Sequence, residues 1–185
     1  MSTLEQLRQS LPELAKDLKS NLETILAGSS LSEEQTWGTA LASAIATRHA
    51  SLAKATCDAA KQFVSAEVIE DAIAAAMLMA QNNVYYRGKH MLGDEPYNSM
   101  PARLRMTRVG KVSSTKANFE LFALAVSAIN SCESCVRIHV SGVTKLGLTE
   151  EQVHDSLRLA AIFQGVAVSL EASVLLLASD SGTSS

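Results

Sequence analysis

The chain has 185 residues and a slightly acidic balance, with 16 Lys and Arg against 19 Asp and Glu and a formal net charge of −3 at pH 7. Nearly half of the residues are hydrophobic but only 4% are aromatic and three are proline, which favours helices over a β-sandwich. No basic block predicts a nucleic-acid surface, no apolar run is long enough to span a membrane, and the first residues do not resemble a signal peptide. We therefore expect one all-α domain over residues 1–185, located in the cytoplasm, with neither nucleic acid nor membrane as a partner.

The first part of the chain contains three stretches with helical periodicity. From Leu4 to Ile25, leucine and isoleucine recur at three- and four-residue steps, which predicts one amphipathic helix closed by Gly28. The sequence SEEQ, which begins at Ser32, matches a capping box and indicates the start of a second helix. A third apolar-periodic run follows Ser65.

The second part of the chain begins with the longest irregular segment, YYRGKHMLGDEPYNSMP, at residues 85–101. Its glycines and prolines and its lack of periodicity predict a connection between two halves or a functional loop. Helical periodicity returns over Lys116 to Ile129, and a further helix is expected to start at the cysteine pair that follows. A second capping box, TEEQ at Thr149 to Gln152, precedes a long apolar helix that is expected to end near Ala178.

A weak internal repeat relates the two parts. When the chain is shifted by 84 residues, SAIATRHASLAK lies under SAINSCESCVRI, and the helix start at Ser65 coincides with the one at Thr149. Few residues are identical, so the argument depends on the ungapped agreement of the helix starts. We predict a duplicated helical unit with copies at about 35–90 and 116–180. The first copy lacks the two cysteines and the histidine of the second, which indicates that the fold does not require them.

The stretch NSCESCVRIH carries the most distinctive chemistry of the chain. With Ser131 as N-cap, Cys132 and Cys135 would lie in the first turn of a helix, where unpaired N–H groups and the positive helix end favour a thiolate. Residues i and i+3 share a helix face, so the two sulfurs can close a disulfide. His139 follows on the same face and can act as a general base. Glu120, which lies among apolar neighbours on the preceding helix, is the candidate that orients the imidazole.

Two other interpretations of these residues remain open. The cysteine pair could lie in a buried helix without a chemical role, and Cys57 is interpreted as an isolated thiol. Alternatively, Cys132, Cys135 and His139 supply three ligands at a spacing that zinc accepts, although the pattern supplies no fourth ligand. The rival to redox chemistry is therefore a Cys2His metal-binding module.

The segment KANFELFALAVSAINSCESCVRIH, Lys116 to His139, resembles the alkyl hydroperoxide reductase D (AhpD) family of the carboxymuconolactone-decarboxylase-like superfamily. The resemblance consists of a glutamate, a Cys-x-x-Cys and a histidine four residues after the second cysteine, in that order and spacing. It implies an AhpD-like all-helical fold and an antioxidant alkyl hydroperoxidase. A decarboxylase on the same scaffold is a weaker alternative, because it would leave the cysteine pair without a role.

The resemblance also implies a role for each residue of the motif. Cys135 is expected to attack the peroxide and become a sulfenic acid, and Cys132 is expected to resolve it as a Cys132–Cys135 disulfide. His139 and Glu120 are expected to form the proton relay. The chain departs from the family at Ser134, where a histidine often precedes the second cysteine. A hydroxyl cannot carry a proton charge near neutral pH as imidazole can, so peroxidase activity or its pH optimum is expected to differ.

The partners of the protein follow from the same resemblance. No bound cofactor or metal is expected. Electrons would come from an external dithiol, the lipoyl group of a lipoylated dehydrogenase-complex protein, and would regenerate an AhpC-like peroxiredoxin. The family further implies a homotrimer. The alternative function is a protein disulfide reductase or adaptor without significant peroxidase activity of its own.

Overall fold

Helices form all the regular structure among the described residues, which in this computed structural model are 3–93, 95–97 and 99–180, with side chains described as far as Leu176. The all-α class that the sequence predicts is therefore confirmed. In chain order the helices are α1 (Thr3–Ser10), η1 (Glu13–Ala15), α2 (Lys16–Ala27), α3 (Glu33–Ala46), α4 (Ala50–Ala60), α5 (Ala66–Leu92), η2 (Thr107–Gly110), α6 (Lys116–Ile129), α7 (Glu133–Lys145) and α8 (Glu150–Asp180).

The predicted capping boxes begin α3 and α8. The Ser32 hydroxyl accepts a hydrogen bond from the Gln35 backbone N–H, and the Gln35 side chain accepts one from the Ser32 N–H. Thr149 and Gln152 exchange the same two bonds at 3.2 and 2.9 Å. Each pair satisfies two of the N–H groups that a helix leaves unpaired at its start, so the sequence locates both helix starts correctly.

Two predicted boundaries within residues 1–101 were wrong, and each error has a local cause. The single helix predicted over residues 4–25 is divided into α1, η1 and α2, because Pro12 has no N–H to continue α1 and restricts the backbone of the residue before it. The irregular segment predicted at residues 85–101 is helical as far as Leu92. Gly88 does not break α5, since a single interior glycine costs a helix only about 1 kcal/mol. The helix ends instead at Gly93, which adopts a left-handed conformation with φ 73°.

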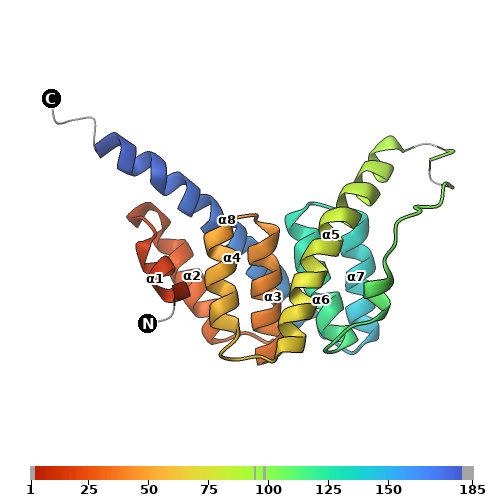
Figure 1. Ribbon diagram of the computed structural model, residues 1–185, viewed down its shortest axis with the longest axis horizontal. Coiled ribbons are helices and arrows are strands. Elements are labelled where there is room, and N and C mark those ends of the chain that lie inside the picture. The colour runs from red at the N-terminus through yellow and green to blue at the C-terminus, as the bar shows by residue number, and fades with distance from the viewer. Residues whose placement is uncertain (1–2, 94, 98, 181–185) are drawn as a thin grey trace.

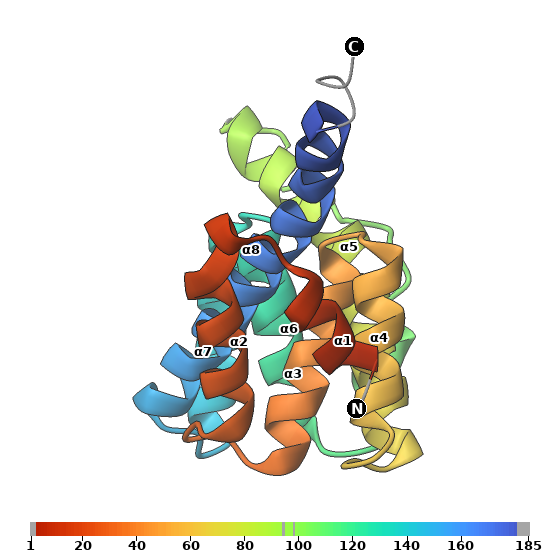
Figure 2. The same cartoon turned by 90° about the vertical axis from the view of Figure 1, so that its left-hand side faces the viewer.

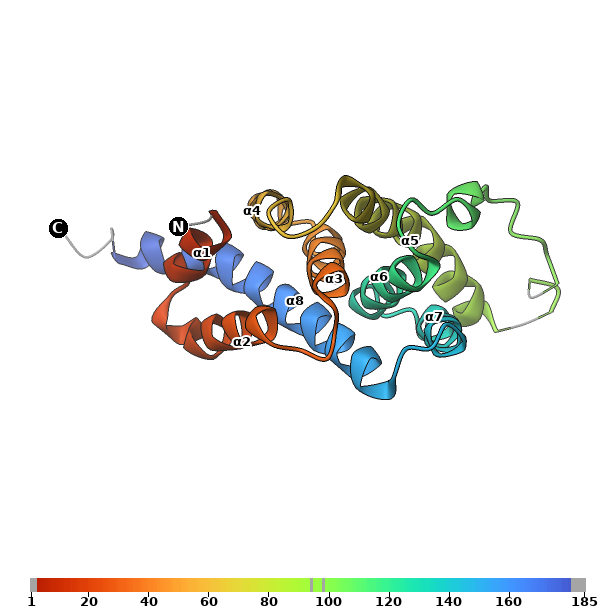
Figure 3. The ribbon, with the colours of Figure 1, turned by 90° about the horizontal axis from the view of Figure 1, so that it is seen from below.

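α3 and α6 form the centre of the molecule, and the other long helices pack around this pair (Figure 1). α5 contacts both central helices, α7 lies against α6 and α5, and α8 packs against α2, α3 and α6 (Figure 3). α1 and α2 lie at one end, and residues 99–106 lie at the other (Figure 1). Phe119, Phe122 and Phe163 are the largest fully buried side chains. The largest buried apolar side chains therefore lie on α6 and on the adjoining half of α8.

α8 is the one helix among the described residues that is long and apolar enough, over Glu150–Leu176, to span a membrane by length and composition. Its first half is a core helix, because Leu159, Phe163 and Val166 are fully buried. Its last turns extend beyond the body, where Val174 and Leu175 are exposed (Figure 2). Length and apolar content alone do not distinguish a core helix from a membrane helix.

The contact between α3 and α6 joins residues that are 84 positions apart, the offset of the predicted repeat. The Asn118 side-chain amide donates a hydrogen bond to Glu34 Oε2 at 2.9 Å, one turn from the site where the Phe122 ring lies against Gly38. Helices that contact each other through equivalent residues are related by a local two-fold axis. These contacts support our proposal that the two halves arose by duplication.

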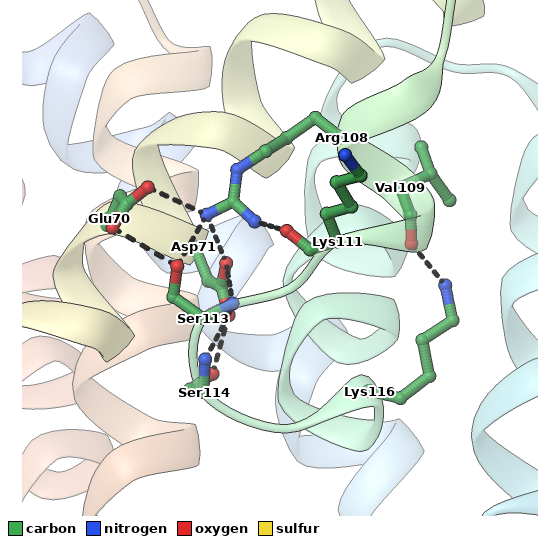
Figure 4. Close-up of polar contacts among 8 residues, drawn as sticks. All are labelled: Glu70, Asp71, Arg108, Val109, Lys111, Ser113, Ser114 and Lys116. Atoms are coloured by element: carbon green, nitrogen blue, oxygen red, sulfur yellow. Dashed lines mark hydrogen bonds and ion pairs between the residues drawn. The ribbon is translucent and has the colours of Figure 1, made fainter.

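Two buried aspartates make a pair of contacts that are related by the same 84-residue offset. Asp71 on α5 accepts hydrogen bonds from the backbone N–H and hydroxyl of Ser114, just before α6 (Figure 4). Asp155 on α8 accepts the same two bonds from Ser30, just before α3. Both aspartates are almost fully buried. Each half of the molecule therefore fixes the loop that leads into the central helix of the other half.

Replacing Asp71 with alanine is expected to lower the free energy of unfolding by about 2–4 kcal/mol, because it removes the buried carboxylate that accepts hydrogen bonds from Ser113, Ser114 and Arg108. Burial opposes ionisation of Asp71, but hydrogen bonds from Ser113 and Ser114 hold its pKa below the usual value. The stabilisation is therefore complete above the ordinary aspartate pKa of about 4 and is lost as the pH falls through the lowered pKa. Urea unfolding of both proteins at pH 7 and pH 3 should show a smaller difference at pH 3. Alanine at the exposed Asp17 is the control, and an equal difference at both pH values would contradict the assignment.

Candidate active site

The two cysteines lie at the sharp turn between α6 and α7. Ser131 has a left-handed backbone with φ 55° and ends α6, so the extended N-cap residue of α7 is Cys132. The predicted N-cap at Ser131 is therefore wrong by one residue, and only Cys135 lies inside the first turn of α7. Non-glycine residues seldom adopt a left-handed conformation, and the surrounding contacts hold the turn in place. Arg87 donates to the backbone carbonyl of Asn130, which closes the turn against α5.

Cys132 and Cys135 are joined by a disulfide, with their Cα atoms 5.3 Å apart. The Cys132 side chain is fully buried, whereas Cys135 is 6% exposed and lines a cavity. Cys135 is also the cysteine whose position in the first turn exposes it to the unpaired N–H groups of α7. Both observations make Cys135 the sulfur that a small molecule in the cavity would reach, and its reduced form the better candidate for a thiolate.

His139 and Glu120 form the hydrogen-bonded pair that the sequence predicts. His139 Nδ1 lies 2.6 Å from Glu120 Oε2, and Lys116 Nζ lies 2.9 Å from Glu120 Oε1. Burial opposes ionisation of Glu120, but the hydrogen bonds from His139 and then Lys116 keep its pKa below the usual value. An ionised carboxylate accepts the Nδ1 proton, which leaves the other nitrogen, Nε2, to exchange protons with a reactant. This nitrogen lies 3.3 Å from the sulfur of Met79.

A glycine on α7 makes room for the carboxylate. A Cβ atom at Gly142 would lie 3.2 Å from Glu120 Oε2, which is closer than most Cβ contacts. Gly142 is one turn after His139, so the absence of its side chain allows α6 and α7 to bring the carboxylate and imidazole together. The periodicity of the sequence gives no sign of this role, because a glycine inside a helix is read as a weakness or a break.

A cavity of about 440 Å³ adjoins these groups. Its lining combines the three predicted residues Glu120, Cys135 and His139 with a mainly apolar remainder: Met79, Asn82, Tyr86, Met106, Val109, Gly110 and Ile138. Cavities of this kind, apolar with a few polar groups, bind small organic molecules. Sequence analysis missed the apolar lining, since methionine and valine at these positions look like ordinary core residues.

The described residues contain no group of three or more His, Cys, Asp or Glu side chains placed to hold a metal ion. In this state the sulfurs of Cys132 and Cys135 are bonded to each other and are not available together as thiolate ligands. The metal-binding alternative therefore gains no support from the geometry. Cys57, the remaining cysteine, is a partly buried free thiol on α4, outside the cavity lining.

Comparison with known proteins first gives the class of the molecule. The profile of the carboxymuconolactone decarboxylase family matches residues 97–178, a range that contains Glu120, both bonded cysteines and His139. The helices α1 to α5 lie outside this match. The helical fold and the site are thus related to this family over the second half of the chain.

Full-length relatives give a narrower assignment. The chain is 50% identical to a protein named alkyl hydroperoxide reductase AhpD from Anaeromyxobacter sp. (strain K) over 171 residues, 92% of each chain. It is 45% identical to proteins of the same name from Corynebacterium kroppenstedtii, over 91% of this chain and 96% of the relative, and from Mycolicibacterium paratuberculosis, over 94% and 97%. The chain belongs to the alkyl hydroperoxide reductase AhpD family.

Proposed function

We propose that this protein is an antioxidant alkyl hydroperoxidase whose dithiol is Cys132 and Cys135. One observation carries the proposal: Cys135 and His139 line the same apolar cavity, with Cys135 bonded to Cys132 and His139 bonded to Glu120. A sulfur, a proton carrier and room for an alkyl group are the parts that thiol-dependent reduction of an alkyl hydroperoxide needs. The names of the full-length relatives agree with this activity.

The proposed cycle starts from the reduced protein. His139 takes the Cys135 proton, and the thiolate attacks the terminal oxygen of ROOH, which breaks the O–O bond. Cys135 becomes a sulfenic acid, and the alkoxide leaves as ROH after taking a proton from the imidazolium. The Cys132 thiol then displaces water from the sulfenic acid and forms the disulfide. The peroxide gains two electrons and the cysteine pair loses two.

Glu120 would serve this cycle by holding the imidazole. Its carboxylate fixes the Nδ1 proton and stabilises the imidazolium that forms when His139 takes the Cys135 proton. Glu120 does not itself need to exchange protons. The proton that leaves the thiol is the proton that the alkoxide needs, so a single imidazole is sufficient for the first half of the cycle.

An external dithiol would complete the cycle, so no resident cofactor is required. We propose the lipoyl group of a dehydrogenase-complex protein as this reductant. The lipoyl dithiol closes to a cyclic disulfide as it returns two electrons and two protons to the cysteines. We also propose that the reduced protein regenerates an AhpC-like peroxiredoxin, that it assembles as a homotrimer, and that it acts in the cytoplasm, where thiol systems keep cysteines reduced.

A disulfide reductase or adaptor role is the second candidate, and Ser134 favours it. The Ser134 hydroxyl lies 3.6 Å from Cys132 Sγ, at the position where the family often has histidine. A hydroxyl can donate a hydrogen bond to a thiolate but cannot store a proton near neutral pH. The step in which Cys132 displaces water from the Cys135 sulfenic acid would then be slower, and peroxide reduction with it. Exchange with a protein disulfide would still proceed.

Thiol titration under peroxide tests the proposed function. We expect the reduced protein to lose two of its three thiols together when it is mixed with cumene hydroperoxide, with Cys57 remaining free. Mass spectrometry should locate the new bond between Cys132 and Cys135. If the thiols are lost only after a peroxiredoxin disulfide is added, the adaptor role replaces the peroxidase role. If neither oxidant removes them, both roles are excluded.

A further inference from the structure

One wall of the cavity is a short segment that two charged side chains hold in place. Met106, Val109 and Gly110 belong to or adjoin η2, in the chain that leads into α6. Arg108 fixes this segment to α5 through Asp71 at 2.7 Å and Glu70 at 3.1 Å (Figure 4). The wall is therefore tied to a buried carboxylate on α5, the helix that also supplies Met79, Asn82 and Tyr86 to the cavity lining.

Lys116 provides the second attachment of the wall. Its ammonium group donates a hydrogen bond to the backbone carbonyl of Val109 at 2.9 Å (Figure 4). The same ammonium group lies 2.9 Å from Glu120 Oε1. It also lies 5.6 Å from the centre of the Phe119 ring, a distance that suits a cation–π contact. A single side chain at the start of α6 therefore touches both the cavity wall and the carboxylate beside His139.

Both oxygens of Glu120 are bound in this arrangement, one to Lys116 and one to His139. Two partners hold the carboxylate beside the imidazole, and water screens the contact with His139 poorly because the Glu120 side chain is only 13% exposed and that of His139 11%. The charged or titratable groups that face it are Lys116 on α6 and His139 on α7. Cys135 on α7 and Tyr86 on α5 are the other titratable groups in the cavity lining.

We propose that Lys116 is a positioning residue, which holds Glu120 against His139 and at the same time holds the Met106–Gly110 wall over the bound alkyl group. This inference rests on the proposed function, because it assigns Lys116 a part in the relay that serves Cys135. Through Lys116, the contact that shapes the cavity also sets the geometry of the proton carrier. A substrate group that fills the cavity and presses on the wall acts on the relay through the same ammonium group.

The test is the rate at which the pre-reduced protein loses two thiols to cumene hydroperoxide, measured from pH 3.5 to pH 9. Lys116→Met keeps the length of the side chain but removes the charge, and with it the contacts to Val109, Glu120 and the Phe119 ring. Because one of the groups that lower the pKa of Glu120 is lost, the acid limb of the rate profile should move to higher pH. The rate at pH 6 should fall roughly tenfold, because a change of this size corresponds to the free energy of one charge-assisted hydrogen bond.

Two matched variants separate positioning from general effects on the fold. Lys116→Arg restores the charge and should return the acid limb to its original position. Lys111→Met removes an exposed lysine from the same segment and should change neither the rate nor the profile. With hydrogen peroxide, which does not fill the cavity, Lys116→Met should leave the concentration that gives half-maximal rate almost unchanged, whereas for cumene hydroperoxide it should rise several-fold.

An unchanged acid limb in Lys116→Met, in a protein whose thiols still react with peroxide, would overturn the positioning role and leave the proposed function intact. The absence of any thiol loss in the unmodified protein would instead overturn the proposed function itself. If Lys116→Arg fails to restore the acid limb, the effect of Lys116→Met is due to something other than the lost charge, which also excludes the proposal.

Discussion

Serine in place of Cys135 is expected to lower the rate of peroxide consumption by at least about a thousandfold, because the hydroxyl of serine is a far weaker nucleophile than a thiolate. Cys135 is the sulfur that lines the cavity, and it lies in the first turn of α7, where the helix end favours its ionised form. Serine occupies nearly the same volume, so the fold should be unchanged. Stopped-flow measurement of cumene hydroperoxide loss with stoichiometric protein gives the rate without requiring a reductant.

The corresponding Cys132→Ser variant distinguishes the two cysteines. Its Cys135 should still react once with peroxide and stop at the sulfenic acid, which a dimedone adduct on Cys135 would reveal. Cys57→Ser, on a different helix, should react as the unmodified protein does. If Cys135→Ser still reacts and Cys132→Ser does not, the two roles are reversed, although Cys132 is the more deeply buried sulfur.

The residues of the site that sequence reasoning found are those whose chemistry is unusual for their position. Glu120 is a carboxylate within an apolar helix, and the Cys-x-x-Cys with His139 is a pattern that core packing does not require. The structure brings Glu120 and His139 into hydrogen-bond contact, and it bonds Cys132 to Cys135. Helical periodicity was sufficient to predict that these residues lie close together, because they lie on two consecutive helices with a short connection.

The other residues of the site come from places that local patterns cannot connect. Met79 lies 60 positions before His139 in the chain, yet its sulfur contacts the imidazole. In the sequence, Lys116 is an ordinary first-turn lysine. Its contacts with the Met106–Gly110 wall and with Glu120 become visible only in the structure. Ser131 looks like an N-cap, and only its left-handed backbone, imposed by the turn, moves the helix start to Cys132. Tertiary contacts decide each of these cases, and a single sequence does not contain them.

The repeat distinguishes the residues that hold the scaffold together from those that carry the redox chemistry. The equivalent contacts Asp71–Ser114 and Asp155–Ser30 fasten both halves in the same way, although only the second half carries the Cys-x-x-Cys pair. In the first half, the positions 84 residues before Cys132 and Cys135 are Arg48 and Ser51. The scaffold thus depends on the buried carboxylates and the central helix pair, and the redox groups can be changed without loss of the fold.

The second large prediction concerns stability and rests on the contact between Gly38 of α3 and Phe122 of α6. A Cβ atom at Gly38 would lie 2.0 Å from the Phe122 ring, which is itself fully buried. We expect Gly38→Ala to reduce the free energy of unfolding by about 3 kcal/mol, because overpacking outweighs the gain of about 1 kcal/mol in helix propensity. Urea unfolding measures this change.

Gly88→Ala is the matched control, because Gly88 also lies inside a helix and a Cβ atom there would meet nothing within 4 Å. It should stabilise the protein by about 0.5–1 kcal/mol. Adding Phe122→Leu to Gly38→Ala should recover part of the loss, since the shorter side chain vacates the overlap, and the two changes should therefore not be additive. A Gly38→Ala protein as stable as Gly88→Ala would show that α3 and α6 separate without cost. Because Glu120 lies two residues before Phe122 on α6, a forced separation should also slow peroxide reduction in the molecules that remain folded.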